Sequence, residues 1–291
     1  MRHSPLTTPG PGHRSPGKDA DKDADKDPGP GLPLVAVAHG SSDPRAAASV
    51  DTLLSLVRAR AAAAGYPGLD VRAAYLGHAA PTLAQALSAV DGAAVVLPLL
   101  LTAAYHSKTD IPKVLHEVRR ARPRLGISYG RPLGPHPLLR RALERRLAEE
   151  EAMDGEPLSA STAAETVIVL AAAGSSDPAA NAMITDQAER WQAQRGWRAV
   201  LPAYASAASP TPPEAVAAAR RSGARRVLVA SYLLCPGVFA DQVRSDCLAA
   251  GAVAVSPVLG AAPEIADIVL GRYAESLTSG AVPLTDDAAA V

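Results

Sequence analysis

AHGSSDP at residues 38–44 returns as AAGSSDP at residues 172–178, and this repetition indicates how the chain folds. An interval of about 130 residues is too long for one unit of a solenoid, so the chain is predicted to contain two tandem domains of one topology. The second copy keeps every residue of the stretch except His39, which Ala173 replaces. We therefore expect the chemistry to reside in the first copy.

Around the two copies, apolar runs of strand length alternate with Ala-, Arg- and Glu-rich stretches of helix length. Runs as apolar as these are buried on both faces, which predicts α/β domains, each with a parallel four-stranded sheet covered by helices on both faces. The predicted strands are 34–38, 71–76, 94–101, 126–129, 167–171, 199–204, 226–234 and 252–256. The predicted helices of the first half are 44–64, 81–90, 108–122 and 137–150, and a helix is expected after each strand of the second half.

The length of 291 residues suits two domains of ordinary size. We assign residues 32–150 to the first domain, 151–164 to a linker and 165–278 to the second, degenerate copy. Residues 1–31 are rich in Pro, Gly, Asp and Lys and lack an apolar segment, so we expect a disordered tail there and no signal peptide. Residues 279–291 are predicted to form a second tail.

The charge balance excludes several classes of partner. Basic and acidic residues number 29 each, so no global basic field attracts nucleic acid or an anionic membrane, and a small molecule is the expected partner. The apolar stretch 93–104 is too short to span a bilayer. Cys235 and Cys247 are spaced like neither a redox pair nor a disulfide framework, which favours reduced thiols and a cytoplasmic location.

His39 stands at the end of the first predicted strand, where open α/β sheets bind their ligands. Gly40 permits a sharp turn, Asp43 can cap the following helix, and Pro44 suits its first turn. The serines of the two copies and the unpaired N–H groups of the helix starts favour anions, so the predicted substrate-binding residues include Ser41, Ser42, Ser175 and Ser176.

A second histidine follows the third predicted strand. The first and third strands of a doubly wound sheet can lie side by side, so His39 and His106 are expected to face one cleft. The corresponding loop of the second copy has Phe239 near the place of His106, and both histidines are therefore absent together. This paired loss predicts a two-residue site, in which neutral imidazoles bind Fe²⁺, Co²⁺, Ni²⁺ or Zn²⁺ and accept protons.

Three further residues are candidates for the same site. His78 follows the second predicted strand and is a candidate third metal ligand. Arg45 and Lys108 begin the helices after the two histidine loops, and as cations they are candidates to bind an acidic ligand.

These motifs resemble those of the sirohydrochlorin chelatase family in its two-domain long form. The likeness spans residues 34–277 and is carried by HGSSDP after the first strand, PLLLTAAYHSKTDIP at 98–112 and the internal repeat. The resemblance implies two chelatase-like domains that face each other across a cleft, where Fe²⁺ or Co²⁺ is inserted into sirohydrochlorin. His39 and His106 then match the family's catalytic and metal-binding histidines. Short members carry one domain and dimerise, so this chain resembles a fused dimer and is expected to act as a monomer.

The resemblance implies a lyase whose metal is a substrate, with no organic cofactor. The sequence contains no GxxxxGK[ST] phosphate loop, so ATP-independent insertion is expected. Many members have a glutamate where this chain reads YLGH at 75–78, which leaves open the choice of iron, cobalt or nickel, the siroheme or cobalamin pathway, and a role on another tetrapyrrole. Two alternatives also stay open: a carrier of metal or tetrapyrrole without catalysis, and a duplicated flavodoxin-like domain that binds a phosphorylated ligand.

Overall fold

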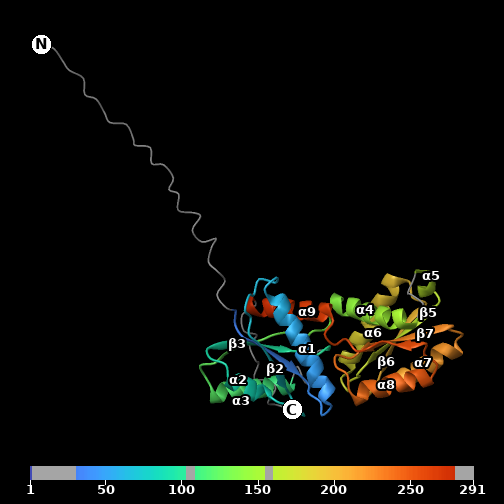
Figure 1. The fold of residues 1–291 in the computed structure, drawn as a ribbon, viewed down its shortest axis with the longest axis horizontal. Helices are drawn as coiled ribbons and strands as arrows, with labels where there is room; N and C mark the ends of the chain where they lie inside the picture. Colours follow the sequence, from blue (N-terminus) through green and yellow to red (C-terminus); the bar gives the residue numbers. More distant parts are fainter. Residues whose placement is uncertain (2–30, 103–108, 155–159, 279–291) are drawn as a thin grey trace.

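The computed structural model describes Met1 and residues 31–102, 109–154 and 160–278. These residues form two parallel four-stranded sheets of one topology, ordered β2-β1-β3-β4 and β6-β5-β7-β8 (Figure 1). The predicted fold class is thereby confirmed. The strands of the first sheet are β1 Leu34–Ala38, β2 Val71–Tyr75, β3 Ala93–Pro98 and β4 Gly126–Tyr129. Those of the second are β5 Thr166–Ala172, β6 Ala199–Tyr204, β7 Arg226–Tyr232 and β8 Ala254–Val255.

Helices separate the strands, as the sequence predicts. They are α1 Pro44–Ala61, α2 Leu83–Ser88, α3 Ile111–Ala121, α4 Pro137–Asp154, α5 Ala160–Ala163, α6 Pro178–Arg195, α7 Pro212–Arg221, α8 Val238–Ala249 and α9 Pro263–Thr278. Several boundaries differ from expectation by one to four residues. The predicted strand 94–101 ends at Pro98, because the Leu100 carbonyl turns away to accept the N–H of Leu133. The predicted linker 151–164 is partly helical, since α4 extends to Asp154 and α5 lies within it.

The repeated stretch builds the same turn in each half. Gly40 has a φ of +90°, and a Cβ there would lie 1.8 Å from the carbonyl oxygen of Gly77, so only glycine fits. The Asp43 carboxylate then accepts the N–H of Arg45 and caps α1. In the second half Gly174 has a φ of +84°, and Asp177 caps α6 in the same way.

The two halves share one hydrophobic core. Separate clusters of buried residues lie on the outer face of each sheet, under α2 and α3 and under α7 and α8. A larger cluster is continuous between the inner faces and contains residues of α1, α4, α6 and α9. Folding one half alone would expose this shared face, so the halves stabilise each other.

The last helix of each half packs on the sheet of the other. Figure 1 shows α9 over the first sheet, beside α1, and α4 over the second. Arg145 of α4 forms an ion pair with Glu264 of α9 at 2.7 Å, which joins the two exchanged helices. Glu151, near the end of α4, is buried against Arg226 of β7. Because α4 packs on the second sheet and α9 on the first, the contacts do not divide the chain at residues 150 and 165. These domain boundaries therefore stay a prediction.

Candidate active site

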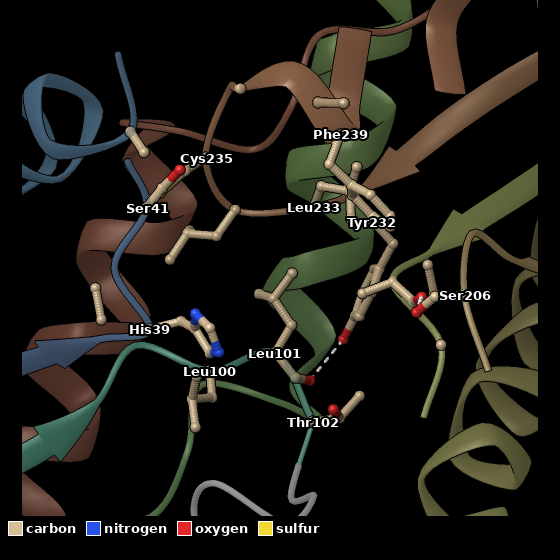
Figure 2. Close-up of a pocket in the computed structure, with 18 of the residues that line it drawn as sticks. His39, Ser41, Leu100, Leu101, Thr102, Ser206, Tyr232, Leu233, Cys235 and Phe239 are labelled. Carbon is tan, nitrogen blue, oxygen red and sulfur yellow. Dashed lines mark hydrogen bonds between the residues drawn. The ribbon is translucent and has the colours of Figure 1, made fainter. Parts of the chain in front are cut away.

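A cavity of about 1130 Å³ lies between the two halves, at the carboxyl ends of the strands of both sheets (Figure 2). Its walls are the loops after β1 and β3 from the first half and the loops after β5, β6 and β7 from the second. Open parallel sheets bind their ligands at the carboxyl ends of the strands, so this cavity is the expected place for a ligand.

His39 lies on the wall of this cavity, immediately after β1, and its side chain is exposed. Its Nδ1 lies 3.1 Å from the carbonyl oxygen of Gly40. A carbonyl oxygen can only accept, so in the neutral tautomer that makes this hydrogen bond Nδ1 carries the proton and Nε2 carries the lone pair. A lone pair in this position suits both the binding of a metal ion and the acceptance of a proton.

The second copy brings the same turn to the opposite wall without an imidazole. Ala173 occupies the place of His39 and also lines the cavity. Asn181 distinguishes the two turns further: its side chain accepts the N–H of Ser175 at 3.0 Å and donates to the carbonyl of the same residue at 2.7 Å. The first half has Ala47 at that place in the repeat, and alanine has no amide that could bind the backbone of Ser41 in the same way.

The four predicted substrate-binding serines all line the cavity, namely Ser41, Ser42, Ser175 and Ser176. Two of them already support their turns, because Ser41 Oγ accepts the N–H of Asp43 at 3.1 Å and Ser175 Oγ that of Asp177 at 3.0 Å. Their hydroxyl protons can still be donated to a ligand.

Arg45 is absent from the residues that line the cavity, and its predicted contact with an acidic ligand stays a prediction. Its guanidinium is held at 2.6 Å by Asp43 and at 2.6 Å by Asp241 of α8, which raises the pKa of Arg45 further. The Asp43 carboxylate, whose pKa is lowered mainly by Arg45, also receives the N–H of Val238. Arg45 thus joins the two halves beside the cleft, and among the described residues no Lys or Arg lines it.

The remaining predicted residues do not line the described part of the cavity. His78 is exposed, has a φ of +60° and is absent from the cavity wall. The N–H of the preceding Gly77 donates to the carbonyl of His39 at 3.2 Å, so the loop of His78 runs next to His39 and its role as a ligand stays a prediction. His106 and Lys108 lie outside the described residues, and their roles stay predictions. Within the described ranges no cluster of three or more His, Cys, Asp or Glu side chains could hold a metal ion.

Sequence reasoning identified Ser175 and Ser176 on the second wall but missed other residues that form it. Tyr232 is buried at the end of β7, and its hydroxyl donates to the carbonyl of Leu101 at 3.0 Å across the cleft (Figure 2). Cys235 also lines the wall, and burial raises the pKa of its thiol to about 11, which keeps the thiol protonated at neutral pH. The repeat predicts the loop that contains Cys235 and Phe239, but no motif in this loop indicates that its side chains bind a ligand.

Comparison with known proteins supports the duplication. The family model described as CbiX matches the chain twice, at residues 33–150 and 167–276. No helix of the described residues is long and apolar enough to cross a membrane.

Two curated relatives come from Priestia megaterium. A sirohydrochlorin ferrochelatase is 29% identical over 176 residues, which are 59% of this chain and 63% of the relative. A sirohydrochlorin cobaltochelatase is 30% identical over 149 residues, which are 51% of this chain and 47% of the relative. The chain thus spans less than two thirds of the length of either relative.

Solved structures share the fold. SirB from Bacillus subtilis with Fe³⁺ superposes with a TM-score of 0.69 at 23% identity, covering 85% of this chain and 96% of that one. The sirohydrochlorin chelatase SirB from Bacillus subtilis subspecies spizizenii, in complex with cobalt, has a TM-score of 0.66 at 22% identity and covers 84% of this chain and 94% of that one. At these identities the likeness establishes the chelatase-like fold.

Proposed function

The chain belongs to the CbiX family, and from this membership and the geometry of the cleft we propose that it is a chelatase that inserts Fe²⁺ or Co²⁺ into sirohydrochlorin without ATP. The observation that carries the proposal is the position of His39, on the wall of a cavity between two copies of one fold, of which only the first keeps an imidazole. The relatives named for iron and for cobalt support both metals, and the experiment below separates them.

Insertion replaces two pyrrole N–H protons by one divalent cation, so the reaction releases two protons for each metal bound. In the proposed mechanism His39 Nε2 binds the entering ion in place of part of its water shell and then releases it to the nitrogens of the ring. The lone pair freed by this transfer accepts one of the two ring protons, and the other passes to the proposed second imidazole or to water. His106 is proposed as the second imidazole, on the evidence of the repeat alone.

The carboxylates of sirohydrochlorin are proposed to meet the two repeated turns. The four serines of these turns line the cavity just before the starts of α1 and α6, and helix starts favour negative charge. Lys108 stays a candidate from the sequence. Arg45 is engaged with Asp43 and Asp241, so we assign carboxylate recognition to the turns.

The chain is further proposed to act as a monomer. The exchange of α4 and α9 supplies, within one chain, the mutual coverage that two separate copies would otherwise provide.

Cys235 and Cys247 are unpaired, which supports a reducing compartment such as the cytoplasm.

Initial rates of metal insertion test the proposal. Sirohydrochlorin is mixed anaerobically with Fe²⁺ or with Co²⁺, and the absorbance change is followed for wild type, His39→Ala and a blank without protein. We expect wild type to exceed the blank, and His39→Ala to lose about 100-fold or more in rate because general base and ligand are removed together. His116→Ala is the control, since His116 is exposed on α3 and absent from the cavity wall.

A carrier gives a different result in the same experiment. It binds sirohydrochlorin or metal tightly but never exceeds the blank, and that outcome would refute catalysis. A His39→Ala variant as active as wild type would refute the role of the imidazole.

A further inference from the structure

The first turn of α8 exposes two large apolar side chains into the cleft. Val238 is 73% exposed and Phe239 46% exposed, and both line the cavity. Elsewhere in the described residues few large apolar side chains are as exposed. Neighbouring exposed apolar residues on a cavity wall indicate a surface that a ligand covers.

The repeat shows what Phe239 replaces. Leu34 pairs with Val95 in the first sheet, and Ile168, which holds the place of Leu34 in the repeat, pairs with Leu228 in the second. Val95 therefore corresponds to Leu228, and His106 lies as far beyond Val95 as Phe239 lies beyond Leu228. The second half thus has an aromatic ring at the position of the first half's predicted metal ligand.

The surroundings of Phe239 are apolar as well. Leu233 and Leu234 line the same wall, whereas His39 and the Gly40–Asp43 turn line the wall of the first half. Figure 2 shows Phe239, Leu233 and Tyr232 grouped on one side of the pocket and His39 on the other. The wall from the first half therefore carries the imidazole of His39 and the Asp43 carboxylate, whereas the described residues of the other wall include no ionised group.

We propose that Phe239, together with Val238, is a substrate-binding residue that packs against the flat face of the tetrapyrrole. This inference rests on the proposed function and extends it by dividing the work between the halves: the second half holds the ring while the first delivers metal and removes protons. A conjugated macrocycle has an apolar face that stacks on an aromatic side chain, and its carboxylates project from the rim toward the polar turns.

Equilibrium binding of metal-free sirohydrochlorin tests this role without requiring turnover. The absorbance of the ring is titrated with wild type, Phe239→Ala and Phe239→Tyr. We expect Phe239→Ala to raise Kd about tenfold and Phe239→Tyr to stay within about twofold of wild type, because tyrosine keeps the ring face. Leu248→Ala is the matched control, since Leu248 lies on the same helix, is 41% exposed and does not line the cavity.

Steady-state kinetics give a second measurement. Phe239→Ala should raise KM with kcat within about threefold of wild type, because the interaction is made equally in the ground and transition states. An unchanged Kd in Phe239→Ala, or no binding by wild type, overturns the inference. A change in sedimentation with Kd unchanged assigns the apolar pair to contacts between copies and also overturns it. If wild type binds the ring but inserts no metal, and Phe239→Ala weakens that binding, the proposed chelatase activity fails while this contact stands.

Discussion

The hydroxyl of Tyr232, in the second half, donates a hydrogen bond of 3.0 Å to the carbonyl of Leu101, in the first. The Leu101 carbonyl is confined from another side by Gly134, where a Cβ would lie 1.9 Å from its oxygen. Gln187 donates to the same hydroxyl at 3.4 Å. The second half of the protein therefore positions the backbone that follows β3 in the first half. This backbone lies next to Thr102, which lines the cleft.

Tyr232→Phe removes this bond and leaves the Leu101 carbonyl without its donor. We expect a loss of about 1 kcal/mol in the free energy of unfolding. We also expect kcat for metal insertion to fall about three- to tenfold, because small displacements of a site wall lower catalytic efficiency. Denaturant unfolding and initial rates measure the two effects.

Tyr273→Phe is the control for this substitution. Tyr273 is likewise buried, and its hydroxyl donates to the carbonyl of Leu32 at 2.7 Å, away from the cavity. It should lose similar stability with kcat unchanged. Equal losses of kcat in both variants would show that Tyr232 acts only through stability.

The ion pair between Arg45 and Asp241 predicts that loss of either side chain has the same effect on KM. If Arg45 serves to join the halves, Arg45→Ala and Asp241→Asn should raise KM equally. The increase should be no more than about threefold, because exposed ion pairs contribute little. The double variant should then resemble either single one.

A direct contact between Arg45 and a substrate carboxylate gives another pattern. Arg45→Ala would then raise KM far more than Asp241→Asn does. Arg60→Ala controls for loss of charge on α1, because Arg60 pairs with Asp267 at 2.7 Å and is absent from the cavity wall.

His78→Asn should leave metal insertion within about twofold of wild type, since His78 is exposed and absent from the cavity wall. Asparagine is chosen because it tolerates the positive φ of this position. The measurements are the Co²⁺ affinity by calorimetry and the initial rate. A tenfold loss of either would restore His78 as a ligand.

The ion pair between Arg145 and Glu264 predicts how the exchanged helices respond to acid. The hydrogen bond from Arg145 is the main cause that holds the pKa of Glu264 below its ordinary value of 4.5. The folded state therefore favours the carboxylate, and this contribution is fully present above pH 4.5 and is lost as the pH falls through the lower pKa of the folded state. Glu264→Gln should be less stable than wild type by about 1 kcal/mol at pH 7.

Urea unfolding at a series of pH values measures this difference, which should shrink as the pH falls below 4.5 and through the lower pKa of the folded state. Glu149→Gln is the control, because Glu149 pairs with Arg146 within α4 alone and does not join the helices. A difference that stays constant down to the lowest pH would contradict the electrostatic origin.

Much of the fold could be predicted because its signals are local. The apolar runs predict β1, β4 and β6 to the residue, and the Gly, Asp and Pro of the repeated stretch each act within a few residues to form the turn and cap α1 and α6. Cys235 and Tyr232 could not be assigned to the site, because their position on its wall depends on how the two sheets face each other.

Local patterns were sufficient to predict two copies of one α/β topology and to place His39 at a strand end in the first copy only, because strand, turn and cap depend on neighbouring residues. Three features became visible only with the packing of the two sheets. Helices α4 and α9 each pack on the sheet of the other half, Arg45 pairs with Asp241 at a separation of 196 residues, and Tyr232 donates to Leu101 at a separation of 131. These contacts follow from how the buried faces of the two halves fit together. No pattern within either segment records that fit, because the partners of each contact meet only when both sheets have folded.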